Sequence, residues 1–360
     1  MTTAPTGLAP KDSSTERTRR IRLVASLLAV VAGLVLVSVP AWASSGLMRT
    51  LVEFFCLFAL AQLWNLLAGY AGMVSVGQQA WIGLGGYSLI VFAQDLHVNM
   101  FVAALLGGLV AGLVALPASW ILFRLRVGYF AIGTWVVAEV IHLLVAGSTD
   151  WLQGGLGRTL TVAAAFERGR REDLTYWLAL GVGIGAALLL HFVMRSPIGL
   201  GLTAIRDSEG AASSLGVPTE RIKRLVYLIC AVGTGVVGGV IYLNVLRITP
   251  PAAFSVQWSA FMIFIVVIGG IGTPEGPLLG TIVFFGIREY LSDFGPWSVI
   301  LLGLVAILMM FAAPKGLRGL LERHLHLDLI SVRRHLPAAL IPPRGDAEGV
   351  TDPTAGGGQS

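Results

Sequence analysis

The chain has 360 residues, of which 55% are hydrophobic and 12% are Asp, Glu, Lys or Arg, and its formal net charge is +5. That charged share is about half of what a water-soluble domain carries, which excludes a single soluble core. The 45 glycines suit helices that pack closely in lipid. The sequence therefore predicts an all-α fold, a polytopic transmembrane helical bundle with glycine-rich breaks.

Apolar stretches of near-membrane length recur along the chain. A transmembrane helix needs about 20 apolar residues, and stretches of this kind, some of them shorter, predict about eight to ten spans. They cover residues 23–41, 50–67, 79–92, 99–123, 128–145, 174–194, 225–246, 259–270, 278–287 and 297–313. The predicted organisation is a disordered basic N-terminus over 1–22, a membrane domain over 23–320 and a mostly disordered tail over 321–360.

The N-terminal part also has features of a secretory signal peptide. A basic stretch and an apolar run precede Ala41, Trp42 and Ala43, a pattern typical of a cleavage site. A leader ending at residue 43 would exceed the usual length of about 15–30 residues. We therefore expect an uncleaved first span, with cleavage as the alternative.

The basic residues predict the orientation of the bundle. With the N-terminus inside and about ten spans, most of the 25 Lys and Arg residues fall in inner segments. Loops that stay in the cytoplasm carry this bias. Both termini are therefore predicted to be cytoplasmic, and the basic charge indicates topology rather than a nucleic-acid partner.

Signatures of catalysis and metal binding are missing from the sequence. It contains no P-loop, no His-Glu-x-x-His and no Gly-x-Ser-x-Gly motif, so it offers no nucleotide cradle, zinc site or nucleophile elbow of these kinds. Its six His are scattered. Cys56 and Cys230 lie in apolar stretches and are predicted to be packing residues. We therefore expect no enzyme activity, no cofactor and no metal site.

Two glycine-rich segments, 69–79 and 269–280, interrupt the apolar stretches and match at an offset near 200 residues. Non-helical backbone at membrane depth is tolerated only where protein or a water-filled cavity covers it. We interpret both segments as breaks beside a transport path, as in discontinuous transporter helices. An ordinary tight inner turn is the alternative. The path residues predicted here are Gly69, Gly72, Gly77, Gln78, Gly269, Gly272 and Gly276.

Glu139 is the one carboxylate well inside an apolar stretch, and His142 follows it on the same helical face. An ionisable group at that depth is expensive and marks a polar pathway by default. Glu139 is therefore also predicted to line the path. The alternative is a neutral Glu bonded to a neighbouring helix, such as the one that carries Gln62 and Asn65.

The loop over 195–224 is the most informative hydrophilic segment. Pro197 and Gly199 end the preceding helix, residues 204–215 are predicted to form one short amphipathic helix, and residues 216–218 end it. A short exposed helix suits the docking of a cytoplasmic partner that moves the bundle, with a passive interfacial helix as the alternative. The predicted coupling residues are Ala204, Arg206, Asp207, Glu209, Ala211, Ala212, Leu215 and Gly216.

Five segments resemble the permease subunits of bacterial branched-chain amino acid ABC importers, the LivM branch. They are NLLAGYAGMVSVGQQAWIGLGGY (65–87), GYFAIGT (128–134), AIRDSEGAASSLGV (204–217), GGIGTPEGPLLG (269–280) and PKGL (314–317). The resemblance implies a multi-pass permease domain over 23–320 in the bacterial inner membrane that moves branched-chain amino acids inward. It also implies that 195–224 is a coupling loop seated on ATP-hydrolysing subunits. A second permease subunit, forming a heterodimer, and a periplasmic or lipid-anchored substrate-binding protein would complete the importer.

One outer stretch departs from the family pattern. Its core GGLG over 154–157 is recognisable, but the flanking residues differ, which leaves the substrate open. A urea or short-amide ABC importer permease is therefore an alternative. From other classes, a passive channel and an ion-coupled secondary transporter remain, although the latter needs coupling acids and only Glu139 qualifies.

Overall fold

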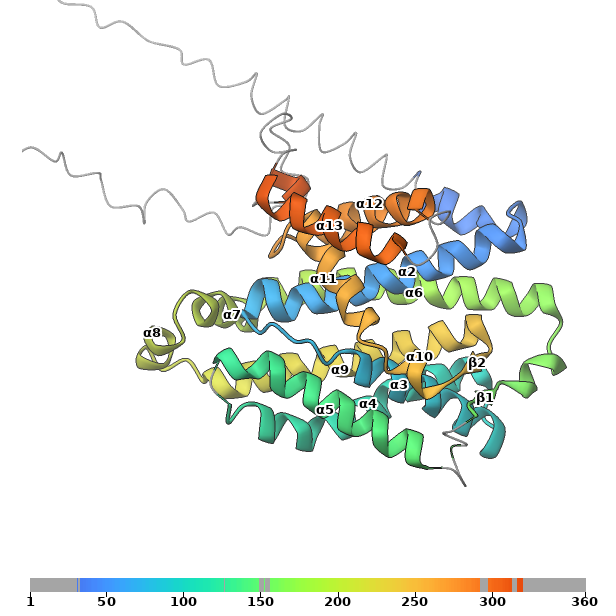
Figure 1. The fold of residues 1–360 in the computed structure, drawn as a ribbon, viewed down its shortest axis with the longest axis horizontal. Helices are drawn as coiled ribbons and strands as arrows, with labels where there is room; N and C mark the ends of the chain where they lie inside the picture. Colours follow the sequence, from blue (N-terminus) through green and yellow to red (C-terminus); the bar gives the residue numbers. More distant parts are fainter. Residues whose placement is uncertain are drawn as a thin grey trace, which may run out of the picture. The chain divides into compact units, whose positions relative to one another are not determined.

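The computed structural model describes residues 31, 33–125, 127–148, 152, 156–291, 297–312 and 316–319. These residues form a bundle of helices with one small two-stranded sheet (Figure 1). Six helices in the described part are long and apolar enough to cross a membrane: Ser45–Tyr70, Met100–Leu122, Gly128–Gly147, Arg168–Arg195, Thr219–Val245 and Pro250–Gly269. The predicted all-α polytopic bundle is confirmed. The segments predicted for 1–22 and 321–360, and residues 23–30 and 32 of the first predicted span, lie outside the described residues.

The described elements follow one another with short connections. They are a 3-10 turn η1 (Val39–Ala41), α2 (Ser45–Asn65), a π-helical turn η2 (Leu66–Tyr70), α3 (Gln79–Ile90), a π-helical turn η3 (Val91–Asp95), α4 (Met100–Leu122), α5 (Val127–Gly147), β1 (Arg158–Thr159), a 3-10 turn η4 (Thr161–Ala165), α6 (Arg168–Arg195), α7 (Pro197–Asp207), α8 (Glu209–Ser214), α9 (Thr219–Val245), β2 (Arg247–Ile248), α10 (Pro250–Ala253), α11 (Gln257–Gly269), α12 (Gly276–Leu291) and α13 (Trp297–Ala312).

Several predicted spans begin, end or extend differently in the structure. The stretches predicted at 79–92, 278–287 and 297–313 form α3, α12 and α13, which have 12, 16 and 16 residues. The stretch predicted at 174–194 is part of a longer helix, because α6 already begins at Arg168. An apolar run shows where a helix can contact lipid, whereas the ends of the helix depend on capping. The ends of the apolar run and the ends of the helix therefore differ by several residues.

The centre of the bundle is formed by α2 and α9, which are the most buried of the six long helices. The helices α3 and α4 pack on α9, and α6 packs on α2 (Figure 1). Glycine permits the closest of these contacts: a Cβ added to Gly85 of α3 would lie 1.9 Å from the carbonyl oxygen of Gly235 of α9. Small residues allow helix backbones to approach in this way in membranes. Cys56 and Cys230 are buried packing residues, as predicted.

At the end of the bundle where α3 and α9 terminate, the loop after α5 pairs with β2 and is bonded to η3. We call this arrangement the clasp. The strands β1 and β2 pair antiparallel, with Arg158 opposite Ile248. The Arg158 guanidinium donates to both carboxylate oxygens of Asp95, over 2.7 and 2.8 Å. The Gln94 amide donates to the carbonyl oxygen of Thr159 over 2.8 Å. Side-chain bonds and strand pairing therefore hold this loop against η3.

The Asp95–Arg158 pair should make the stability of this clasp depend on pH. The hydrogen bonds from Arg158 hold the pKa of Asp95 below its ordinary value. The folded state thus favours the carboxylate, so the stabilisation is complete above the ordinary pKa of about 4 and is lost as the pH falls below it. A partly exposed pair contributes about 0.2–1 kcal/mol.

We expect Asp95→Asn to lower the melting temperature of the detergent-solubilised protein at pH 7 and to have a smaller effect at pH 3. Glu167, which makes no side-chain cap bond at the start of α6, supplies the control Glu167→Gln. An Asp95→Asn effect that is the same at both pH values would contradict the assignment.

Candidate functional site

The two glycine-rich breaks meet at one place in the structure. Gly69 lies in η2, and Gly272 lies in the loop between α11 and α12. A Cβ added to Gly69 would lie 2.5 Å from the backbone nitrogen of Gly272, so the two backbones touch. Gly72 and Gly272 both have positive φ, 68° and 72°, a conformation that glycine adopts without strain. Gly72 and Gly272, which are 200 residues apart in the sequence, therefore share a left-handed φ.

Amide side chains of α2 bind the α11–α12 loop. The Asn65 carbonyl oxygen accepts a hydrogen bond from the Gly272 nitrogen over 2.8 Å, and its amide donates to the Thr273 carbonyl oxygen over 2.9 Å. The Gln62 amide donates to the carbonyl oxygen of Pro274 over 3.0 Å. Both side chains are buried. The side-chain hydrogen bonds that Asn65 and Gln62 make here go to the α11–α12 loop, not to Glu139.

Arg206 of α7 connects the coupling loop to both breaks. Its guanidinium Nη1 donates to the carbonyl oxygen of Gly69 over 3.0 Å. The same nitrogen would lie 3.3 Å from a Cβ added to Gly272. We call the four residues Asn65, Gly69, Arg206 and Gly272 the junction. It joins α2, α7 and the α11–α12 loop through hydrogen bonds to backbone.

The described part of the C-terminal motif, residues 316–317, reaches the same region. A Cβ added to Gly316 would lie 2.6 Å from the backbone nitrogen of Gly270, so this segment packs against the second break. Next to it, the Arg318 Nε lies 3.3 Å from Glu275 Oε2 in an ion pair. Asn65, Gln62 and Arg318 were not predicted as site residues, although Asn65 begins the first family-like motif and Arg318 directly follows the last.

The predicted helix over 204–215 is in fact two helices. Ser208 is extended, with φ −162° and ψ 106°, and it separates α7 from α8. Its side-chain oxygen accepts a hydrogen bond from the Ala211 nitrogen over 3.3 Å. Serine competes with helical backbone bonding in this way and favours the position before the first helical residue. The amphipathic pattern concealed this break.

The predicted coupling residues divide by exposure. Leu215 is 84% exposed, and Arg206, Asp207, Ala211 and Gly216 are also exposed, while Ala204 is half-buried. Glu209 forms an ion pair with Lys223 of α9. Ala212 is 1% exposed, so its side chain packs within this chain and we assign it no docking role. Gly216, with φ 82°, follows the end of α8 as predicted.

Gly77 and Gln78 are the buried end of the non-helical segment between η2 and α3, in which Gly72 and Val74 are exposed. A Cβ added to Gly77 would lie 2.0 Å from the carbonyl oxygen of Thr134. The Gln78 carbonyl oxygen accepts a bond from Thr234 Oγ1 over 3.4 Å, and the Val76 nitrogen donates to Thr134 Oγ1 over 3.1 Å. Side chains of the neighbouring helices α5 and α9 thus form hydrogen bonds with this segment, as a break inside a membrane bundle requires. The first break is longer than a tight turn.

The second break is compact. A Cβ added to Gly269 would lie 1.8 Å from the carbonyl oxygen of Gly276, so the two ends of this loop are in contact. The Gly276 nitrogen donates to Thr273 Oγ1 over 3.1 Å. Gly269 and Gly276 therefore close a narrow turn whose outer part, Gly272, contacts Gly69.

Glu139 lies away from the junction, on α5. Its side chain is 50% exposed, and its Oε1 lies 3.2 Å from Nδ1 of His142. The His142 ring stacks on Phe254, with ring centroids 5.5 Å apart. The structure therefore brings the two breaks and the coupling loop together but not Glu139.

The model of the family of branched-chain amino acid transport system permease components matches residues 46–314. That range contains both breaks, α7 and α8. This chain belongs to that family. The chain is thus a multi-pass membrane permease component, as the sequence motifs indicated.

Two bacterial members of the permease family are similar over most of the chain. The high-affinity branched-chain amino acid transport system permease protein LivM of Salmonella typhimurium is 25% identical over 288 residues, which cover 73% of this chain and 68% of that protein. LivM of Escherichia coli has the same identity and coverage. A probable LivM of Methanocaldococcus jannaschii is 25% identical over 246 residues, 63% of this chain and 69% of that protein. No solved structure matches this permease.

Proposed function

We propose that this chain is the transmembrane permease subunit of an ABC importer that carries branched-chain amino acids inward across the bacterial inner membrane. The observation that carries the proposal is the bond from Arg206 of α7 to the carbonyl oxygen of Gly69. It links an exposed pair of short helices directly to the touching breaks of two spans. The two bacterial LivM relatives are named as branched-chain amino acid transport permeases, which supports the cargo class.

In this proposal α7 and α8 lie on the cytoplasmic side, together with both termini, and dock on partner ATP-binding subunits. A second permease subunit, in a heterodimer, and a periplasmic or lipid-anchored substrate-binding protein complete the importer. With the N-terminus placed inside, most of the 25 Lys and Arg residues of the sequence fall in inner segments, which supports this orientation.

The proposed mechanism is alternating access driven from the α7–α8 side. Closure of the ATPases on ATP moves α7, and the Arg206 bond passes that movement to η2. Because Gly69 touches Gly272, the α11–α12 loop moves with it. Coupling of this kind requires contacts that differ between the two states. The path lined by Gly72, Gly77, Gln78, Gly269 and Gly276 then opens to one side.

Uptake into proteoliposomes tests the proposal. The chain is reconstituted with its second permease subunit, the ATPases and the binding protein. Uptake of labelled leucine, isoleucine, valine, urea and acetamide is then measured with and without ATP on the side of the membrane that carries the ATPases. We expect ATP-dependent, binding-protein-dependent uptake of the three amino acids and none of urea or acetamide.

Two outcomes would contradict this assignment. Uptake of urea or acetamide in place of the amino acids would reassign the permease to the short-amide class. Uptake by the chain alone, driven by a proton gradient in ATP-free vesicles, would make it a secondary transporter with Glu139 as the candidate coupling acid.

A further inference from the structure

Two basic side chains from the first two turns of α9 cover aromatic rings at the end of α4. The Lys223 Nζ lies 5.8 Å from the centroid of the Phe123 ring. The Arg224 Cζ lies 5.9 Å from the centroid of the Trp120 ring. The π face of an aromatic ring attracts a cation placed in this way. Both contacts lie at the end of the bundle that carries α7 and α8, because α9 begins just after α8.

The cations that lie over aromatic rings differ in their carboxylate partners. Lys223 forms an ion pair with Glu209 of α8. Arg288 of α12 lies 5.9 Å from the centroids of two phenylalanine rings and forms an ion pair with Glu53. In the described part of the chain Arg224 forms no ion pair, and its buried Nε has no hydrogen-bond partner. A buried N–H without an acceptor is rare, so we look for an acceptor outside this chain.

Two further arginines extend the positive charge around Arg224. Arg221 is exposed and precedes it by three residues on α9, so both lie on the same helical face. Arg124 is exposed in the turn that follows α4, four residues after Trp120. We call Trp120, Arg124, Arg221 and Arg224 the basic patch. The nearest carboxylate in the sequence, Glu220, is also exposed, so the patch keeps an excess of positive charge.

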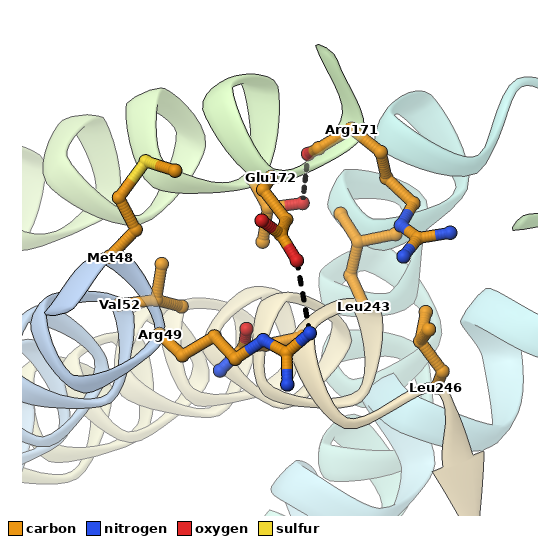
Figure 2. A pocket seen from close by; sticks show the side chains of 9 residues that line it. Met48, Arg49, Val52, Arg171, Glu172, Leu243 and Leu246 are labelled. Carbon is orange, nitrogen blue, oxygen red and sulfur yellow. Dashed lines mark hydrogen bonds and ion pairs between the residues drawn. The ribbon is translucent and has the colours of Figure 1, made fainter. Parts of the chain in front are cut away.

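Arginines at the opposite end of the bundle are bonded within the chain. In the pocket formed by α2, α6 and α9, Arg49 donates to Glu172 Oε1 over 3.0 Å (Figure 2). Arg171 donates from Nη1 to the Ala163 carbonyl oxygen over 2.9 Å. The cavity measures about 20 Å³, which is room for about one water molecule. That end is an internal network, whereas the basic patch faces outward.

An exposed apolar ridge runs along α4 from the basic patch into the membrane span. Its members are three or four residues apart, so they lie on one face of the helix. Each is between 43% and 66% exposed: Leu105, Leu109, Leu113, Leu116 and Trp120. Tryptophan is enriched where a span meets the membrane surface. The ridge is suited to acyl chains, and the basic patch at its end is suited to the phosphate that heads them.

We infer that the basic patch binds the phosphate of an anionic phospholipid whose acyl chains lie along the ridge of α4. The lipid belongs to the cytoplasmic leaflet, which rests on the proposed function because that function places α7 and α8 in the cytoplasm. A guanidinium offers paired donors to phosphate oxygens, and basic pockets between spans bind anionic headgroups on this side of a membrane. Lys223, the residue before Arg224, holds α8 through Glu209. A bound lipid therefore braces the start of α9 beside α8.

Native mass spectrometry of the purified permease–ATPase complex tests the inference. The delipidated complex in detergent is titrated with phosphatidylglycerol, which is anionic, and with phosphatidylethanolamine of the same acyl chains, which is zwitterionic. We expect phosphatidylglycerol to bind at least about fivefold more tightly and an excess of inorganic phosphate not to displace it.

Three variants locate the site. Arg224→Gln should remove most of the preference for phosphatidylglycerol. Arg288→Gln is the matched control, because it removes a guanidinium that also lies over an aromatic ring but already has a carboxylate partner. It should keep the wild-type preference. Trp120→Leu changes no charge and should weaken phosphatidylglycerol binding by about two- to fivefold.

Four results would overturn the inference. They are equal binding of the two lipids by the wild-type complex, an equal preference in Arg224→Gln and Arg288→Gln, displacement of the lipid by inorganic phosphate, and loss of the ATPases from Arg224→Gln with its lipid preference intact. The third would assign the patch to a soluble anion and the fourth to a protein partner. If Arg224→Gln does not assemble, the lipid comparison and the phosphate competition on the wild-type complex decide.

Uptake of labelled leucine with the binding protein present is measured on the same preparation, which separates the two proposals. Normal uptake without a lipid preference rejects the lipid site and keeps the proposed function. A lipid preference without leucine uptake rejects the proposed function and keeps the lipid site.

Discussion

Replacing Leu215 by Asp should abolish ATP-driven uptake and co-purification of the ATPase subunits while leaving the permease folded. Leu215 follows α8 and is 84% exposed, so the change removes no packing within this chain. A large apolar side chain so exposed on a short hydrophilic segment is suited to a pocket on a partner. A buried charge without a partner in such an interface is expensive, and the expected loss of affinity is at least about 100-fold.

The matched control is Leu156→Asp. Leu156 is also 84% exposed but lies in the loop before β1, at the other end of the bundle. The Leu156→Asp variant should therefore co-purify with the ATPase subunits at the wild-type level. Glu209 is a less direct probe, because its ion pair with Lys223 mixes docking with the folding of α8. Retention of the ATPases by Leu215→Asp would refute the docking role of this segment.

A second large effect is expected at the contact between the two breaks. Gly69→Ala places a Cβ within 2.3 Å of Asn65 Oδ1 and 2.5 Å of the Gly272 nitrogen. Neither neighbour can withdraw freely, because Asn65 and Gly272 are bonded to each other. Overpacking of this kind lowers stability by about 1–3 kcal/mol. We expect a lower melting temperature and a loss of uptake of at least about tenfold, because separation of the two loops also breaks the Arg206 connection.

Gly185→Ala provides the comparison for the same chemical change. Gly185 lies in α6, and nothing lies within 4 Å of the added Cβ. Alanine is also the better helix former, so stability should be unchanged or slightly higher and uptake should be normal. If Gly69→Ala transports and melts like Gly185→Ala, the two breaks do not depend on their contact.

Local patterns were sufficient for the long helices, the breaks and the family, although not for the number of helices long enough to cross a membrane, which is six in the described residues against the predicted eight to ten. The apolar stretches predicted the long helices because lipid selects for hydrophobicity residue by residue. Glycine-rich segments predicted the breaks because loss of helical hydrogen bonding is a local property. The break at Ser208 was missed although its signal is also local: a serine just before an acidic residue is typical of a helix start, and the amphipathic pattern across 204–215 obscured it.

The sequence by itself determined that this chain is a helical membrane permease component, because composition, apolar length and motif order need no knowledge of contacts. Only the tertiary structure decided which of the candidate residues lie together. Arg206 follows Gly69 by 137 residues and precedes Gly272 by 66, and the packing of α2 against α11 and of η2 against α7 brings them together. Whether Glu139 faces a neighbour or the surface depends equally on helix rotation in the bundle, which periodicity leaves open. The pocket formed by α2, α6 and α9 exists for the same reason, since no single segment contains more than one of its walls.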